Sequence, residues 1–361
     1  MIMRRHIARV GIGLALALSL WSPRFAQAAE NFQLYISNER SADVTIIDGS
    51  DLKVVGTIPV GKRPRGIHAS ADGKMVYVAL SGTPIATTKI DAQGNPIFQR
   101  GKDDDDDAAS RADKAADGIG VLNVAQRKLT GKLLVGSDPE EFSLSKSGKQ
   151  LYISNEDVKA ASVVNLASGK IEHVIEVGQE PEGVGTAPDG KSFYVTCEAG
   201  GEIFVIDTSS YEVIGRFSVP PRPRSIDFLR GSAIGFIPSE STGQLNVIDT
   251  ASYKVLKTIT LPPGSRPMSV KVAPDGRKIY VSNGRAGTVL VLDSRTYELL
   301  DSIKVGTRPW GMSISPDGKY LYTANGPSND LSVVDLQTDK EIAKIQAGES
   351  PWGVTVVPNA H

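Results

Sequence analysis

The sequence predicts an all-β protein that forms a single seven-bladed β-propeller, and three observations support this prediction. First, 36 glycines and 21 prolines, with only 3 tryptophans among 361 residues, are typical of many short strands joined by tight turns. Second, a proline-centred motif recurs with a period close to 42 residues. Third, the two ends of the chain carry complementary parts of one repeat.

The recurring motif is a proline that follows a small-residue turn and precedes an alternating apolar stretch. Its members are Pro64, Pro139, Pro181, Pro223, Pro267, Pro309 and Pro351, with spacings of 75, 42, 42, 44, 42 and 42 residues. Thirteen residues after the first six of them come Tyr77, Tyr152, Tyr194, Phe236, Tyr280 and Tyr322. A period of about 42 residues is the length of one four-stranded propeller blade.

The stretch 306–347 shows the expected course of one blade. We predict strands over 310–315, 320–325, 331–335 and 341–345, with the turn Pro316-Asp317-Gly318 between the first two. An Asp-Gly pair suits this turn because it tolerates the positive φ of tight hairpins. The fifth repeat departs from the pattern, since Phe228-Leu229-Arg230-Gly231 replaces the Pro-Asp-Gly turn.

The two ends of the chain supply one blade between them. The last repeat, 348–358, contains only a first strand, whereas 34–38, 44–48 and 54–60 read as three strands without a first one. Joining them in one sheet closes the ring and removes the exposed strand edges of an open array. The count is therefore seven blades in residues 29–361.

Residues 1–28 read as a cleaved secretory signal peptide. Arg4, Arg5 and Arg9 precede an apolar run over 10–21, and Ala26-Gln27-Ala28 forms an Ala-x-Ala cleavage site. The run is shorter than the roughly 20 residues that span a bilayer. We expect a periplasmic monomer without a membrane span, whose 36 basic and 41 acidic residues give a net charge near −5. That charge argues against a nucleic-acid partner.

Four tetrads carry a resemblance to a known family. Tyr35-Ile36-Ser37-Asn38, Tyr152-Ile153-Ser154-Asn155, Tyr280-Val281-Ser282-Asn283 and Tyr322-Thr323-Ala324-Asn325 resemble the YVTN repeat of bacterial propellers. The resemblance weakens at Leu80, Cys197 and Ser239, which take the Asn position. More narrowly, the chain resembles the propeller proteins associated with pyrroloquinoline quinone (PQQ)-dependent alcohol catabolism. This resemblance implies a periplasmic accessory role beside quinoprotein dehydrogenases and transporters, without a known catalytic activity.

The residues that flank the recurring prolines form the candidate site, because loops before first strands and after second strands open on one face of a propeller. The predicted ligand-binding residues are Arg63, Arg65, Arg222, Arg224, Arg266, Arg308, Trp310 and Trp352. Arginines bind carboxylates at two points and indoles stack on flat rings, so a planar anion such as PQQ would suit them. The alternative is a ring of ion pairs from Arg63, Arg65, Arg222 and Arg224 to Asp138, Glu140, Glu180 and Glu182, with no ligand.

A second group of residues suggests metal binding. Glu140, Glu180 and Glu182 are candidate Ca²⁺ ligands, and the loops after second strands add Glu39, Glu156, Glu198 and Glu240 to the same face. The alternative is a solvated acidic rim. His68 is either a base in the channel or a hydrogen-bonded packing residue.

Blade two is 33 residues longer than a 42-residue repeat, which is the excess of its 75-residue spacing. We place the inserted loop at about 82–117, with a small hairpin from 85–90 and 96–99. The acidic run Asp103–Asp107 within it reads as a solvated loop, or as a lid or docking arm over the arginines.

The sequence as a whole predicts a non-catalytic binding propeller that docks a protein partner, such as a quinoprotein dehydrogenase or transporter component, or a small anionic ligand. No Cys-x-x-Cys-His, Gly-x-Ser-x-Gly or P-loop motif points to a common catalytic chemistry. The alternatives are a Ca²⁺-dependent lactonase-like hydrolase and a structural module of the envelope or surface layer.

Overall fold

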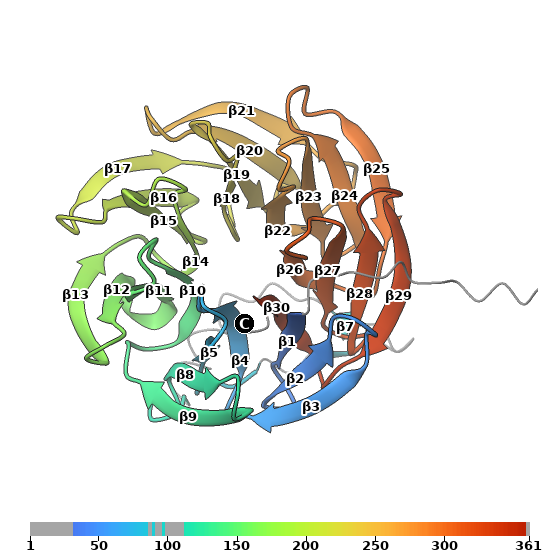
Figure 1. Cartoon of the computed structure of the whole chain (residues 1–361). Helices are drawn as coiled ribbons and strands as arrows, with labels where there is room; N and C mark the ends of the chain where they lie inside the picture. Colours follow the sequence, from blue (N-terminus) through green and yellow to red (C-terminus); the bar gives the residue numbers. More distant parts are fainter. Residues whose placement is uncertain (1–31, 86–88, 91–95, 98–111, 359–361) are drawn as a thin grey trace, which may run out of the picture.

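The chain folds into seven four-stranded antiparallel sheets arranged radially about a central channel (Figure 1). The computed structural model describes residues 32–85, 89–90, 96–97 and 112–358. The predicted signal peptide and the acidic run Asp103–Asp107 lie outside these residues. The predicted seven-bladed propeller is confirmed.

Each blade follows the chain from the channel outward, except the one that joins the termini. Blade one contains β30 (Pro351–Pro358), β1 (Phe32–Asn38), β2 (Asp43–Asp48) and β3 (Val54–Pro59). Blade two contains β4 (Pro64–Ala69), β5 (Met75–Leu80), β8 (Gly118–Asn123) and β9 (Lys128–Leu133). Blade three contains β10 (Pro139–Leu144), β11 (Gln150–Asn155), β12 (Ala160–Asn165) and β13 (Lys170–Glu176), with a 3-10 turn η1 (Glu156–Val158) after β11.

The remaining blades repeat this order. Blade four contains β14 (Pro181–Thr186), β15 (Ser192–Cys197), β16 (Glu202–Asp207) and β17 (Val213–Ser218). Blade five contains β18 (Asp227–Phe228), β19 (Ile234–Ser239), β20 (Gln244–Asp249) and β21 (Lys254–Thr260). Blade six contains β22 (Pro267–Val272), β23 (Lys278–Asn283), β24 (Thr288–Asp293) and β25 (Leu299–Lys304). Blade seven contains β26 (Pro309–Ile314), β27 (Tyr320–Asn325), β28 (Asp330–Asp335) and β29 (Lys340–Gln346).

Both ends of the ordered ring meet in blade one, as predicted. β1 pairs antiparallel with β30 from Phe32↔Pro358 to Asn38↔Pro351, and its other edge pairs with β2. The last strand of the chain therefore closes the sheet that the first strands begin. Closure also places β30 between β26 and β4, the first strands of the two neighbouring blades.

The tyrosines of the repeat fill the spaces between blades. Tyr35, Tyr152, Tyr194, Tyr280 and Tyr322 are among the largest fully buried side chains. Tyr152 stacks on Phe193 of the next blade with ring centroids 4.2 Å apart and planes 6° apart. Burial raises the pKa of Tyr152 to about 12, because the phenolate would lose its hydration there. Such aromatic contacts pack each sheet against its neighbour.

In three blades, the asparagine that ends the tetrad explains the glycine three residues before the proline, namely Gly136, Gly306 and Gly348. Asn325 donates from Nδ2 to Ser332 Oγ at 2.8 Å and to Asp330 Oδ1 at 2.6 Å. The chain of Gly306 passes so close that an added Cβ would lie 2.6 Å from Asn325 Cγ. Only glycine permits this approach, so the recurring Gly and Asn act as one packing unit.

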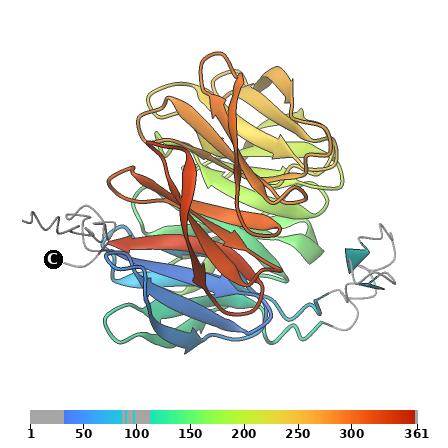
Figure 2. The ribbon, with the colours of Figure 1, turned by 90° about the vertical axis from the view of Figure 1, so that its right-hand side faces the viewer.

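Blade five is irregular at the place where its sequence departs from the repeat. β18 has only two residues, and an isolated bridge from Pro223 to Ser239 marks where the missing part of the strand would begin. In blade two, β6 (Lys89–Ile90) pairs with β7 (Pro96–Ile97), which confirms a small hairpin in the insert. Figure 2 shows this hairpin standing apart from the blades. Within the described residues, no helix has the length and apolar character needed to cross a membrane.

Candidate functional site at the channel mouth

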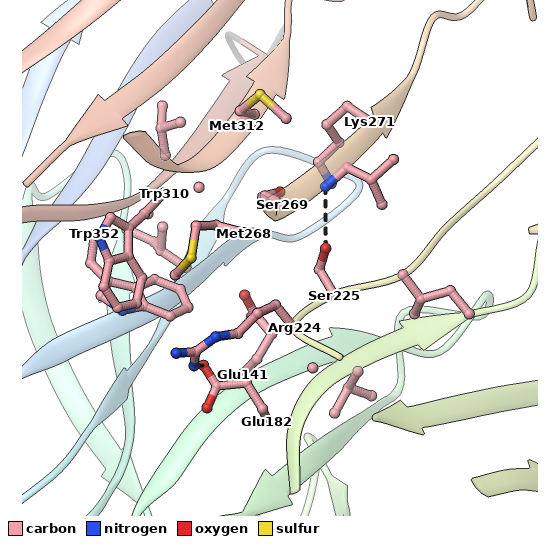
Figure 3. Close-up of a pocket in the computed structure, with 18 of the residues that line it drawn as sticks. Glu141, Glu182, Arg224, Ser225, Met268, Ser269, Lys271, Trp310, Met312 and Trp352 are labelled. Carbon is pink, nitrogen blue, oxygen red and sulfur yellow. Dashed lines mark hydrogen bonds and ion pairs between the residues drawn. The ribbon is translucent and has the colours of Figure 1, made fainter. Parts of the chain in front are cut away.

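The central channel contains a cavity of about 100 Å³ that residues from all seven blades line (Figure 3). The lining residues come from the first strand of each blade or from the residues just before it, such as Arg224 and Ser225 in blade five. Small-molecule pockets usually measure 300–1,000 Å³. The cavity itself therefore suits a very small ligand or a few water molecules, and a larger ligand belongs at its mouth.

The backbone ahead of the recurring prolines holds a left-handed conformation in six blades. The residues are Arg63, Asp138, Glu180, Arg222, Arg308 and Ser350, with φ between 43° and 61°. This conformation is costly for residues with a Cβ, and a following proline disfavours α-type geometry further. In five of these blades the carbonyl of this residue accepts the N–H of the residue after the second strand. That bond joins the two sets of loops on one face, as the sequence analysis expected.

Arg224 is the centre of a buried ion-pair cluster. Its guanidinium lies 2.8 Å from Glu182 Oε1 and 2.7 Å from Glu240 Oε2, and it also pairs with Glu198. Burial alone would lower the pKa of Arg224, but the three carboxylates hold it well above its usual value. Burial also raises the pKa of Glu198, and Arg224 only partly offsets this effect.

Arg222, two residues before Arg224, belongs to the same cluster. It lies 2.7 Å from Glu198 Oε2 and 3.5 Å from Glu240 Oε2. Among the carboxylates of this cluster, only Glu182, the partner of Arg224, belongs to the set proposed for a cross-channel ring. Glu198 and Glu240 come from the loops after second strands, which the sequence placed on this face without pairing them to arginines.

Arg65 is the centre of a second cluster. Its Nε lies 3.1 Å from Glu39 Oε1, and its Nη1 pairs with Glu140. Arg63 shares Glu39 at 3.2 Å and donates to the carbonyl of Thr83, at the start of the insert, at 2.9 Å. Four of the predicted ligand arginines are thus bound to carboxylates of the protein.

The predicted calcium ligands are separated in the structure. Asp138, Glu140 and Glu156 offer oxygens that all lie within 4.8 Å of one another. Among the described residues, only Glu140 of the three predicted ligands belongs to this group, whereas Glu182 pairs with Arg224. Arg65 pairs with Glu140, and Ser81 donates to Asp138. Two of the three carboxylates therefore already have a partner within the protein, and a Ca²⁺ ion would have to compete with Arg65 for Glu140.

The opposite side of the mouth is aromatic and positively charged. Trp310 and Trp352 lie with ring centroids 5.4 Å apart at 46°, and the Arg308 guanidinium lies 4.8 Å from the Trp310 ring. Figure 3 shows the two indoles beside Met268 and facing the Arg224 side chain. Burial and the neighbouring Arg224 lower the pKa of Arg308. The environment of Arg308 therefore favours an added negative charge.

Arg266 completes the predicted arginine set. It is partly exposed ahead of β22, and its backbone N–H donates to Asn283 Oδ1 at 2.7 Å. This bond anchors the loop of blade six at the mouth. Arg266 therefore lies at the same edge of the channel as Met268, on the other side of Pro267.

Sequence reasoning missed Glu141, which lines the cavity together with His68. His68 Nε2 lies 2.9 Å from Glu141 Oε1. The predicted hydrogen bond of His68 is therefore present, and it connects two channel residues of neighbouring blades. A comparison of blades at the second position after the proline contained the signal, because Glu141 is the only charged residue there.

Comparisons with known proteins agree with the fold. A sequence profile of the YNCE-like β-propeller family matches residues 260–361, and one of the choice-of-anchor I domain matches 36–180. A search of curated protein sequences found no match. These matches and the topology place the chain among β-propeller proteins.

Several solved structures are similar in fold. The periplasmic gluconolactonase PpgL of Pseudomonas aeruginosa has a TM-score of 0.67 at 20% identity, over 90% of this chain and 99% of that chain. A putative 6-phosphogluconolactonase of Bacteroides fragilis has a TM-score of 0.69 at 17% identity, over 91% and 98%. Kuenenia stuttgartiensis hydrazine synthase has a TM-score of 0.67 at 20% identity, over 82% and 90%. Identities this low establish a shared fold and leave function to the site.

Proposed function

We propose that the protein is a periplasmic, non-catalytic binding propeller that holds a small anionic ligand with a flat face at the channel mouth. The observation that carries this proposal is the arrangement of Arg308 over Trp310, 4.8 Å from its ring, beside Trp352. An indole face stacks on conjugated rings and a guanidinium binds carboxylates, so together they recognise a flat anion.

Of the predicted ligand-binding arginines, some are already engaged in ion pairs. Arg63, Arg65, Arg222 and Arg224 already bind glutamates, so their main role is to hold the mouth together. We assign ligand contact to Arg308, Trp310 and Trp352, because the indoles line the cavity and the Arg308 guanidinium lies 4.8 Å from the Trp310 ring, with Arg266 at the same edge. PQQ, a flat tricarboxylate, fits this chemistry at the mouth and is too large for the cavity of about 100 Å³ below. We therefore propose an accessory role in PQQ-dependent alcohol catabolism, beside a dehydrogenase or transporter component.

Titration calorimetry with PQQ at low and moderate salt tests this proposal. We expect saturable binding that weakens with salt, because the contact is electrostatic. Arg308→Gln should weaken it at least tenfold, whereas Arg277→Gln, an exposed arginine after β22, should leave it unchanged. Absence of heat at both salt concentrations, or equal affinity of the two variants, would remove the small-ligand proposal and favour protein docking.

A second candidate function is hydrolysis of a lactone. Two observations favour it: the fold likeness to a gluconolactonase and to a putative 6-phosphogluconolactonase, and the His68–Glu141 pair inside the cavity. The Ca²⁺-dependent form of this hypothesis lacks support, because Arg65 pairs with Glu140 of the carboxylate group. Lactone hydrolysis followed by base uptake, with and without a chelator, tests the candidate directly.

A further inference from the structure

We infer that His68 and Glu141 form a metal-independent general-base pair that hydrolyses a small carboxylic ester, open or cyclic, inside the channel. This inference rests on the second candidate function and assigns its residues. His68 is the catalytic residue that contacts water and substrate. Glu141 is a positioning residue that acts through His68.

The repeat provides an internal control for this assignment. Second after the recurring proline, blades one to seven carry Gly353, Gly66, Glu141, Gly183, Ser225, Ser269 and Gly311. Fourth after it, they carry Thr355, His68, Ser143, Gly185, Asp227, Lys271 and Ser313. Six of the seven blades therefore lack a carboxylate at the second residue after the proline, and six lack an imidazole at the fourth residue after it. Both departures occur in adjacent blades and contact each other.

The surrounding residues fix the pair. Glu141 Oε1 accepts the N–H of Phe142 at 2.9 Å in addition to its 2.9 Å contact with His68. The imidazole lies edge-on to the Phe142 ring, with centroids 4.9 Å apart at 86°. An added Cβ on Gly66 would lie 2.4 Å from Glu141 Oε1, so blade two leaves room for this carboxylate. A held histidine with an oriented carboxylate is the arrangement that general-base catalysis requires.

Both side chains remain accessible from the cavity. The side chains of His68 and Glu141 are 36% and 22% exposed, and both line the cavity with Arg224 and Lys271. The titratable groups on strands packed against β4 are Glu140 and Glu141 on β10, Tyr77 on β5 and Tyr35 on β1. Because Arg224 is paired with glutamates, Lys271 is the lining cation that would favour negative charge on a carbonyl oxygen. The volume of about 100 Å³ restricts the substrate to a small one.

The reaction needs only water as co-reactant. With the Nε2 hydrogen of His68 donated to Glu141, Nδ1 takes a proton from water while its oxygen bonds to the carbonyl carbon. The carbonyl π electrons move to the oxygen, which becomes an oxyanion. Its collapse breaks the bond from carbon to the ester oxygen, and the departing alkoxide takes the proton back from His68. One ester and one water thus give one carboxylic acid and one alcohol, and the pair is restored.

The test measures base uptake by the mature full-length chain with δ-valerolactone, and release of nitrophenol from p-nitrophenyl acetate. We expect His68→Gln to lower kcat by roughly 10²–10⁴-fold, the usual range for loss of a general base. Glu141→Gln should lower kcat with KM little changed, because the carboxylate orients the imidazole without contacting the substrate. His173→Gln is the matched control, since His173 stacks on Tyr211 at 4.1 Å on the outermost strand β13.

Each result separates the inference from the candidate function. Hydrolysis that survives His68→Gln would overturn the base pair while leaving a hydrolase. Loss of hydrolysis on adding a chelator would overturn metal independence. A wild-type chain that hydrolyses neither ester would overturn both the pair and the hydrolase candidate, whereas ligand binding at Arg308 would stand or fall on the calorimetry alone. Circular dichroism of each variant shows that the comparison is between folded proteins.

Discussion

Replacing Arg224 by methionine tests whether the ion-pair cluster holds the mouth together. Methionine keeps most of the side-chain volume and removes the charge that Glu182, Glu198 and Glu240 share. These carboxylates have side-chain exposures of only 9%, 5% and 16%. Removing one partner of a buried pair costs about 3–5 kcal/mol, because the remaining charge stays desolvated. Since Arg222 still lies 2.7 Å from Glu198, we expect a loss of about 3 kcal/mol in unfolding free energy.

The loss should depend on pH in a defined direction. Burial already raises the pKa of Glu198 above its usual value, and removing Arg224 raises it further. A carboxyl with a higher pKa in the folded than in the unfolded chain binds more protons when folded, so stability falls as pH rises through the folded pKa. The Arg224→Met variant should therefore be least stable at pH 8 and recover part of its loss at pH 5.

Urea unfolding followed by far-ultraviolet circular dichroism at both pH values measures this effect. The control is Arg216→Met, because Arg216 pairs with Glu202 on outer strands and its side chain is 59% exposed. An exposed pair contributes about 0–1 kcal/mol, so this variant should unfold nearly as the wild type does. A loss below about 1 kcal/mol for Arg224→Met, with no change between pH 8 and pH 5, would refute the argument.

Two further predictions concern the packing of the repeat. Gly306→Ala should destabilise the protein by about 1–3 kcal/mol, because its Cβ would lie 2.6 Å from Asn325 Cγ, whereas Gly131→Ala, with nothing within 4 Å, should be nearly neutral in thermal unfolding. Cys197 is fully buried and burial raises its thiol pKa to about 12, so it should not react with a disulfide reagent in the native state and should react once per chain in urea; rapid native reaction would show that blade four opens.

The fold was predictable because several independent sequence features recur with the same period. The proline, the buried aromatic and the turn residues recur at one period, so an irregularity in one blade leaves the others to define the architecture. Blade seven shows the agreement: the predicted strand 320–325 is β27, and 341–345 lies within β29. The irregularity of blade five was also visible in the sequence, since its altered turn, 228–231, begins at the second residue of the two-residue strand β18.

The pairing of charges at the mouth was less predictable. The sequence placed Arg65 and Arg224 on the correct face but could not choose between Glu140, Glu182 and the acids after second strands as their partners. That choice depends on which loops lie within about 4 Å in space, and the repeat period says nothing about such distances. The result is two clusters, around Arg65 and Arg224, which contain Glu140 and Glu182 of the predicted ion pairs together with Glu39, Glu198 and Glu240.

The aromatic and ionisable residues on which both proposals rest lie along one arc of the ring, although other blades also depart from the repeat, as at Asp227 and Lys271. Trp310 in blade seven, Trp352 in blade one, His68 in blade two and Glu141 in blade three belong to four consecutive blades, and all line the same cavity. The Glu182–Arg224 pair stands across from them in blades four and five. Packing of a seven-fold repeat favours equivalent residues in every blade, so unlike residues that line one cavity need another cause. A ligand that touches these residues is such a cause. Under the second candidate function, a carboxylate made beside His68 would form in the same channel whose mouth carries Arg308 and Trp310.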